Sequence, residues 1–213
     1  MKTVRIIFSK TGRAKYVSHL DLMRTMTRAL RRASIPLWYT EGFNRHPYLT
    51  FAAPLSLGYV GLRESMDIRL EADMDYGVLV DQLNAVLPIG MVAVEANEAQ
   101  AKVKELTAAE YRITFGCSAS SVKELLSLPE IMVEKRTKKK TMKTIDIRPY
   151  FSNAVVEAMG ENRSVMTVTL SCGSAENINP GLFVTALGQY LNASVDAEVE
   201  RQRLLKSDEE EFL

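Results

Sequence analysis

The segment TVRIIFSKTGRAKYVSHLDLMRTMTRALRRAS, residues 3–34, decides the first part of the fold. Its beginning, Thr3–Ser9, is rich in β-branched and aromatic residues and predicts a strand, and Lys10–Lys15 predicts a loop. Ser18 fits the N-cap of a helix that extends to about Ser34, because its hydroxyl can accept a free backbone N–H of the first turn. The segment therefore predicts a strand followed by a long helix.

This predicted helix has an apolar face and a basic face. At about 100° per residue, four apolar side chains gather on one side of the helix: Met23, Met26, Leu30 and Ala33. Arg24, Arg28 and Arg31 gather on the opposite side, followed by Arg32, and only Asp21 lies nearby to offset their charge. Such a stripe fits either a solvated face or a surface that takes its counter-charge from phosphates or an acidic partner.

Working outward from this helix, the pattern predicts the order β-α-β-β-α-β twice. In the first half we expect strands at 37–40, 48–52, 64–71 and 91–96 and a helix at 76–87. In the second half we expect strands at 111–115, 131–136, 144–147, 154–158, 165–171 and 195–203 and helices at 120–128 and 180–191. This order is typical of the split β-α-β pattern. We therefore predict an α+β protein of two tandem ferredoxin-like halves with antiparallel sheets.

The expected domains are residues 1–98, residues 110–205 and a frayed acidic tail, 206–213. The connection between the halves, about 97–109, has a helix-forming composition and predicts a rigid link. Charged residues make up 25% and hydrophobic residues 46% of the 213, which is typical of a soluble globular protein. No apolar run reaches the roughly 18 residues of a membrane span, and no signal peptide is evident. Cys117 and Cys172 are then expected to be reduced thiols of a cytoplasmic protein without membrane partners.

The charges are segregated along the chain. Residues 1–50 hold ten Lys or Arg and two Asp or Glu, and residues 111–150 hold nine and four. An acidic stretch follows each basic block. Basic and acidic segments can neutralise one another within the fold, or the basic blocks can line a surface that binds an anion such as nucleic acid. Both explanations are open from the sequence alone.

Two further segments carry candidate binding residues. The turn KRTKKKTMK, residues 135–143, has a density of cations that favours phosphate contact, through Lys135, Arg136, Lys138, Lys139, Lys140 and Lys143. The loop GFNRHP, residues 42–47, contributes Asn44, Arg45 and His46. Four aromatic residues are candidates for stacking on unpaired bases or for the core: Tyr16, Phe43, Tyr48 and Tyr150.

The chain has two histidines, His19 and His46. His19 follows the Ser18 cap at the positive end of the helix dipole, where a neutral imidazole that accepts a proton is favoured. Both histidines can equally be structural groups with hydrogen-bond partners. No cysteine or carboxylate spacing accompanies them, and the sequence has neither a phosphate-binding glycine loop nor a nucleophile elbow. We therefore expect no metal and no cofactor.

Several motifs in order along the chain resemble the bacterial radical-SAM-associated domain of unknown function. They are VSHLDLMR (17–24), RALRR (28–32) with Pro36, GFNRHP (42–47), PLSLG (54–58), ESMD (64–67), KTMKTIDIR (140–148) and GSAENINP (173–180). Arg45 stands where that family more often has proline. The resemblance implies a radical SAM protein as partner, to which the radical chemistry would belong. This chain lacks a CxxxCxxC motif for an iron–sulfur cluster.

Three functions follow as hypotheses. The first is a non-catalytic accessory protein of a radical SAM protein that binds RNA or a ribonucleoprotein through its basic surfaces. The second rests on similarity to CRISPR repeat-processing endoribonucleases, which pair ferredoxin-like folds. It is a metal-independent nuclease with His19 or His46 as base and Arg24 or Lys140 stabilising the developing charge. The third is an adaptor that binds only protein, through the arginine stripe.

Overall fold

The computed structural model describes residues 2–136, 141–207 and 209–213. The protein has the predicted α+β class, and its strands pair mostly in the antiparallel direction. It divides into two compact units, Met1–Leu106 with Arg201–Leu213, and Thr107–Glu200. The division differs from the expected one in that residues 201–213 join the first unit rather than the second half and a separate tail.

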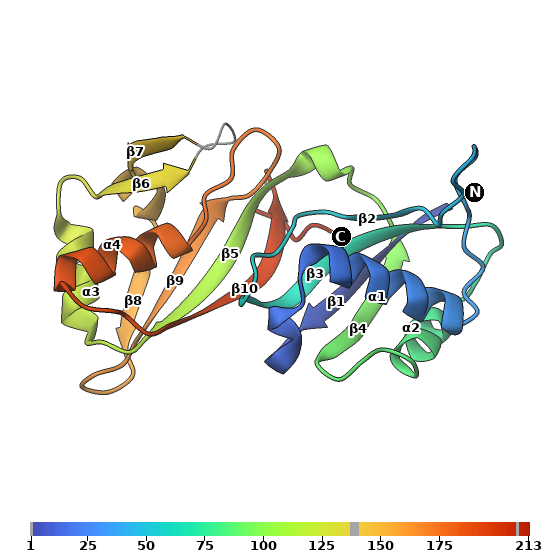
Figure 1. Cartoon of the computed structure of the whole chain (residues 1–213), viewed down its shortest axis with the longest axis horizontal. Helices are drawn as coiled ribbons and strands as arrows, with labels where there is room; N and C mark the ends of the chain where they lie inside the picture. Colours follow the sequence, from blue (N-terminus) through green and yellow to red (C-terminus); the bar gives the residue numbers. More distant parts are fainter. Residues whose placement is uncertain (1, 137–140, 208) are drawn as a thin grey trace. The chain divides into compact units, whose positions relative to one another are not determined.

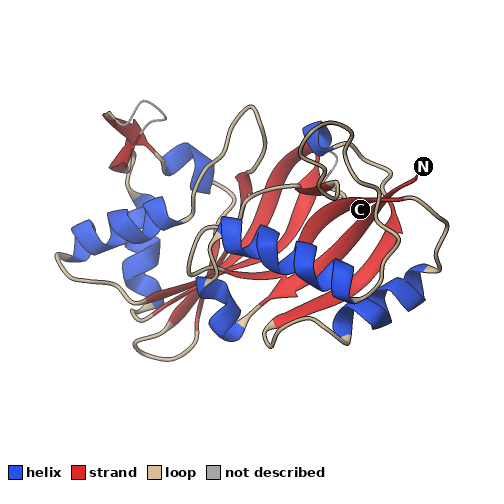
Figure 2. Ribbon diagram, turned by 45° about the vertical axis from the view of Figure 1, so that its right-hand side comes forward, coloured by secondary structure: helices blue, strands red, loops and turns tan. Residues whose placement is uncertain are grey.

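The first unit places helices on a short antiparallel sheet. Its elements are β1 (Lys2–Lys10), α1 (His19–Arg32), β2 (Leu49–Phe51), β3 (Val60–Leu70), α2 (Tyr76–Asn84), β4 (Met91–Glu98) and the end of β10 (Ala197–Lys206). The strands lie in the order β4-β1-β3-β10, and β2 also pairs with β3. Both helices cover the same face of the sheet, where side chains from α1, α2, β1, β3 and β4 form one apolar core (Figures 1 and 2).

Strand alternation explains which side chains of β1 enter that core. Val4 and Ile6 are fully buried and lie opposite Ile68 and Met66 of β3. Arg5 lies between them and therefore points to the other face of the sheet, where its register partner is Asp67. The guanidinium binds this carboxylate through two hydrogen bonds of 2.7 and 2.8 Å.

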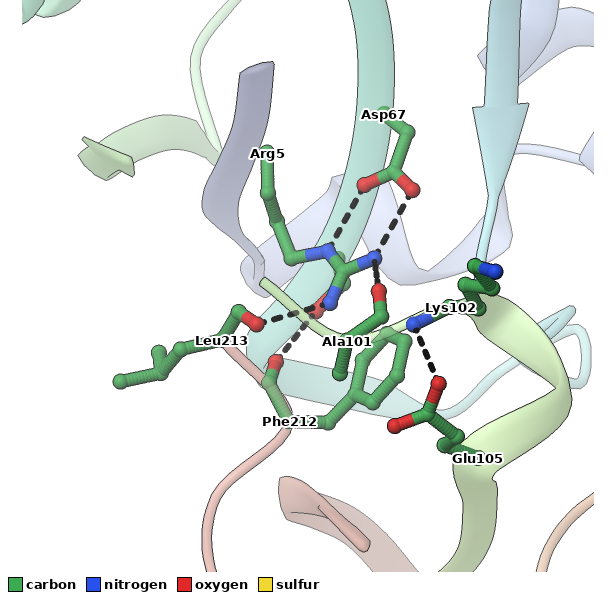
Figure 3. A network of polar contacts seen from close by, with 8 residues as sticks. Arg5, Asp67, Ala101, Lys102, Glu105, Phe212 and Leu213 are labelled. Carbon is green, nitrogen blue, oxygen red and sulfur yellow. Dashed lines mark hydrogen bonds and ion pairs between the residues drawn. The ribbon is translucent and has the colours of Figure 1, made fainter. Parts of the chain in front are cut away.

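The segment at the chain's end covers this second face, so the prediction that it is frayed is wrong. Phe212 is fully buried, and the Arg5 guanidinium lies over its ring, 3.8 Å from the centroid (Figure 3). Arg5 also donates to the backbone oxygens of Leu213 and Ala101, each at 2.9 Å. The acidic composition of the tail indicated disorder, but one buried aromatic side chain and a buried cation hold it in place.

A second group of buried charges lies in the same unit. Arg201 of β10 donates through Nε to Glu64 of β3 at 2.8 Å and through Nη2 to the second Glu64 oxygen and, at 2.9 Å, to the backbone oxygen of Ala53. Lys10 is 1% exposed and donates to the oxygen of Val17 at 3.1 Å. Burial lowers the pKa of this lysine, and the nearby Glu64 carboxylate acts in the opposite direction.

The second unit repeats the arrangement with an added hairpin. Its elements are β5 (Leu106–Phe115), α3 (Ala119–Ser127), β6 (Met132–Arg136), β7 (Met142–Asp146), β8 (Val155–Ala158), β9 (Ser164–Ser171), α4 (Gly181–Leu191) and the start of β10. The strands lie in the order β10-β5-β9-β8, and β6 and β7 form a separate two-stranded sheet. Phe183 of α4 packs against Phe115 and Phe151 in the core, with ring centroids 6.0 and 4.8 Å apart.

Two local predictions are wrong. Residues 37–40 form only isolated bridges, Leu37 with Leu70 and Tyr39 with Pro47, because proline cannot donate to a strand ladder. The helix expected at 76–87 ends at Asn84, whose side-chain amide instead binds the backbone of Ala93 at 2.8 and 2.9 Å. The connection at about 97–109, expected to be a rigid link, consists of the end of β4, a short 3-10 turn (Val103–Glu105) and the start of β5.

Candidate nucleic-acid interface

The α1 helix presents the predicted basic face to solvent. Ser18 caps the helix, accepting the N–H of Asp21 at 3.2 Å and donating its hydroxyl to the Asp21 carboxylate. The buried positions of α1 are Leu22, Met26, Ala29 and Leu30. Arg24, Arg28 and Arg31 are all exposed on the opposite side, as predicted. We call these three residues the α1 basic ridge.

The ridge has little counter-charge of its own. Arg24 pairs with Asp21 at 3.1 Å, an exposed contact of the kind that contributes little stability. Arg31 donates to the hydroxyl of Tyr39 at 3.1 Å and lies 5.5 Å from its ring centroid. Arg28 binds no side chain or backbone group in the described part of the chain. Arg32, by contrast, turns to the backbone oxygen of Val86.

The loop after α1 holds the GFNRHP residues in a fixed turn. The N–H of Thr40 donates to the oxygen of His46 at 2.9 Å, which closes the loop, and Gly42 adopts a φ of 111° that favours glycine. Phe43 is fully exposed at the tip of this loop. Asn44 and Arg45 are exposed as well, and Arg45 has no acidic partner among the described residues.

The two histidines have different surroundings. His46 Nδ1 lies 2.9 Å from the carbonyl oxygen of Asn44, and because this oxygen only accepts, Nδ1 carries the proton. In the neutral ring Nε2 is then an acceptor. The ring of His19 packs edge-on against Phe51, 5.6 Å between centroids. His19 and His46 are both exposed, and within the described chain they form neither a hydrogen bond nor a ring contact with each other.

The four aromatic residues separate into two groups. Tyr16 and Phe43 are exposed, at 66% and 104%. Tyr48 instead stacks on Arg69, whose guanidinium lies 4.2 Å from its ring centroid. Tyr150 donates its hydroxyl to Glu176 at 2.9 Å, and this hydrogen bond raises the pKa of the tyrosine. The Lys15 ammonium lies 5.5 Å from the Tyr16 ring centroid, so among these four only Phe43 has no ring or side-chain contact within the described part of the chain.

The predicted basic turn connects β6 and β7 in the second unit. Lys138, Lys139 and Lys140, with the side chain of Arg136, lie outside the described residues. Lys135 donates to the backbone oxygen of Asn177 at 3.1 Å, and Lys143 is exposed. Both lysines line a pocket of about 610 Å³ together with Tyr150 and residues 173–178.

Residues 3–180 match the family described as "Uncharacterized protein conserved in bacteria (DUF2344)". The chain belongs to this family. A comparison with curated proteins finds no match. Among solved structures the chain is similar to one in "Crystal Structure of a Cbf5-Nop10-Gar1 Complex", with a TM-score of 0.51 and 11% identity, over 97% of this chain and 50% of that one. The chain thus spans half the length of that relative, and the likeness concerns the fold alone.

A second solved structure is an unknown protein from Galdieria sulphuraria, with a TM-score of 0.28 and 13% identity over 94% of this chain and 98% of that chain. Within the described residues of this DUF2344 member, no three His, Cys, Asp or Glu side chains are placed to hold a metal ion. None of its described helices is long and apolar enough to cross a membrane. Within the described chain, Cys117 and Cys172 are not joined in a disulfide bond.

The charge blocks of this DUF2344 member are partly neutralised within the fold. In the first basic block, Arg5 pairs with Asp67, and Lys2 pairs with Asp73 at 3.3 Å. Part of this block therefore neutralises the acidic stretch that follows it in the sequence. Apart from the Arg24–Asp21 pair within α1, the ridge and Arg45 have no acidic partner among the described residues. The two basic blocks belong to different units. Sequence reasoning missed the buried charges, whose partners lie far along the chain, and gave the 173–180 motif no role.

Asp146 holds the β6–β7 hairpin at its base. Its Oδ1 accepts the N–H groups of Ile131 and Arg148 at 2.8 and 2.9 Å, and these bonds lower the pKa of the carboxyl. An acid with a lowered folded pKa stabilises the fold above its unfolded pKa and loses this contribution as the pH falls through the folded value. We expect Asp146→Asn, which keeps the Oδ1 acceptor, to show a smaller loss of Tm on acidification than the parent protein.

The measurement is the Tm followed by circular dichroism from about pH 6 down to about pH 2, the range in which carboxyl groups titrate. Glu130→Gln is the control, because this exposed carboxylate has no partner among the described residues. Its pH profile should follow that of the parent. Parallel profiles for the parent and Asp146→Asn would show that the carboxylate's charge does not contribute.

Proposed function

We propose that this protein is a non-catalytic accessory protein that binds RNA, alone or within a ribonucleoprotein, through the α1 basic ridge and the neighbouring 40–47 loop. The single observation that carries the proposal is the ridge itself. Arg24, Arg28 and Arg31 are exposed in one stripe, with one exposed carboxylate, Asp21, as their ion-pair partner in the described chain. Phosphates supply the counter-charge that such a stripe lacks.

The loop adds the second kind of contact that RNA recognition uses. Phe43 is fully exposed, and its ring offers a face on which an unpaired base can stack. Arg45, two residues later, is exposed and has no acidic partner in the described chain. Stacking on Phe43 with phosphate contacts from Arg45 and the ridge fits single-stranded RNA better than a duplex, whose bases are already stacked.

Two finer statements belong to the same proposal. Each unit has the order β-α-β-β-α-β, and the strand orders β4-β1-β3-β2 and β10-β5-β9-β8 support tandem ferredoxin-like halves, the second with the β6–β7 hairpin inserted. The motif resemblance supports a radical SAM protein as the cytoplasmic partner. In that assembly the partner carries out the chemistry, and this chain binds the RNA.

The test is the RNA affinity of a ridge variant, Arg24→Gln with Arg28→Gln and Arg31→Gln. Fluorescence anisotropy with a labelled single-stranded 20-nucleotide RNA of mixed sequence gives the Kd at several salt concentrations. We expect the variant to bind at least about tenfold more weakly, and its log–log salt slope to fall by about one for each phosphate that the substituted arginines no longer neutralise. The matched control removes three other exposed cations, through Lys104→Gln, Lys123→Gln and Arg163→Gln.

The other hypotheses predict different outcomes of the same experiment. Equal affinities of the parent and the ridge variant would overturn the proposal. If the parent does not bind RNA, and the ridge variant loses a radical SAM partner in a pull-down, the chain is a protein adaptor. Cleavage of the RNA that disappears in His46→Ala or His19→Ala, with binding retained, identifies a nuclease instead.

A further inference from the structure

The pocket of the second unit is formed entirely by residues 135–178. Its volume of about 610 Å³ lies within the range of small-molecule sites, which is roughly 300–1,000 Å³. The β6–β7 hairpin provides Lys135, Lys143 and Ile145, and the loop between β9 and α4 provides residues 173–178. Tyr150 completes the lining from the 3-10 turn Arg148–Phe151.

The hairpin gives the pocket a positive side. Lys135 and Lys143 are directly opposite one another in the β6–β7 register, and like charges in this position destabilise a strand pair. Lys135 donates to the oxygen of Asn177, but within the described part of the chain no acidic side chain pairs with Lys143. Two facing ammonium groups without a carboxylate between them indicate an anion that is supplied from outside.

The opposite loop offers further hydrogen-bond donors. It is closed by the Gly173 N–H, which donates to the oxygen of Glu176 at 2.9 Å, and by the Cys172–Asn177 bridge. The backbone N–H groups of Ser174 and Ala175 have no acceptor among the described residues. Free backbone amides of a tight turn are suited to bind the oxygens of a phosphate.

The remaining lining is partly apolar. Ile145 and the buried Ile178 contribute aliphatic surface, and the Tyr150 ring is fixed because its hydroxyl is bound to Glu176. A fixed aromatic ring beside aliphatic side chains favours a planar ligand group. Glu176 is the single carboxylate in the lining, and its second oxygen has no partner in the described chain, so it can accept an N–H of the ligand.

We propose that this pocket binds a nucleoside monophosphate. The phosphate lies between Lys135 and Lys143 and accepts from the turn amides, and the base lies along Tyr150 with its exocyclic amine toward Glu176. Inorganic phosphate alone would leave Tyr150 and the aliphatic side chains unused, and a divalent cation would be repelled by two lysines and attracted by only one carboxylate. The site lies in a different unit from the α1 basic ridge and does not depend on it.

Isothermal titration calorimetry of the full chain with adenosine 5′-monophosphate tests the proposal, with adenosine and inorganic phosphate as separate arms. We expect the monophosphate to bind at least about tenfold more tightly than either fragment, because only it uses both sides of the pocket. Lys143→Gln should weaken its binding about tenfold, as removal of a charge-assisted hydrogen bond does. Lys123→Gln, an exposed lysine on α3, is the matched control and should leave the Kd unchanged.

Two substitutions of Tyr150 distinguish the contribution of its ring to binding from that of its hydroxyl. Tyr150→Phe should keep the Kd within about threefold, whereas Tyr150→Leu should weaken binding about tenfold because the planar surface is removed. Equal binding of adenosine and its monophosphate, or an unchanged Kd in Lys143→Gln, would overturn the proposal, as would the absence of binding by the folded parent. The ridge variant should bind the monophosphate normally, so failure of the RNA proposal and failure of this one are distinguishable.

Discussion

Glu64→Ala is expected to lower the free energy of unfolding by about 3–5 kcal/mol, the cost of leaving a buried charge without its partner. Glu64 is 4% exposed and accepts from Arg201, which is 2% exposed, and Lys10 is buried close by. Two buried cations would therefore remain without their carboxylate. Urea denaturation followed by circular dichroism measures the change.

Two further variants make this prediction specific. Glu71→Ala removes an exposed glutamate that directly follows the same strand and should change stability by no more than about 0.5 kcal/mol. Combining Glu64→Met with Arg201→Met should recover much of the loss, since a buried ion pair can often be replaced by apolar side chains. A loss in Glu64→Ala as small as that in Glu71→Ala would show that this pair is solvated in solution.

The features that the sequence predicts well are local. The α1 ridge depends on a period of 3.6 residues within one helix and on a cap at Ser18, and both can be identified without knowing the rest of the fold. The hairpin of β8 and β9 likewise lies between two alternating segments with a turn at Gly160. In such elements the residues that interact are a few positions apart, so a short window contains the information.

The features that the sequence does not predict depend on long-range register. Arg5 and Lys10 count as part of a basic block, yet both are buried, because the partner of Arg5 lies 62 residues away. Which residues face one another across β1 and β3 is set when the strands pair, and a one-residue shift would place Arg5 in the apolar core. The alternation Val4-Arg5-Ile6 indicates only that Arg5 faces away from its neighbours.

The candidate binding residues also include some that the sequence predicts and some that only the fold reveals. The cations of the ridge and of the basic turn are evident as charge density in the sequence, and the structure adds which of the described ones have partners. The pocket is not evident there, because Lys135, Tyr150 and Glu176 come from three separate segments. A charge run shows that anions are attracted, but only the fold shows where a ligand's other groups would lie.

Phe212→Ala is expected to destabilise the protein by about 3–5 kcal/mol, the usual cost of removing a buried phenylalanine ring. The ring is fully buried and packs under the Arg5 guanidinium. The backbone N–H of Phe212 donates to the oxygen of Leu204 at 2.9 Å. Its removal opens a cavity beside a buried cation and releases the cover of the second sheet face. The free energy of unfolding from urea titrations gives the effect.

Phe43→Ala is the matched control, because it makes the same chemical change at a fully exposed position. Its effect on stability should be no more than about 0.5 kcal/mol. Hydrogen exchange of the Phe212 variant should also show faster exchange in β1 and β3, whose second face the segment covers, and unchanged exchange in α3. If the two variants are equally stable, residues 211–213 do not pack on the sheet in solution, and Arg5 relies on Asp67 and the backbone oxygen of Ala101.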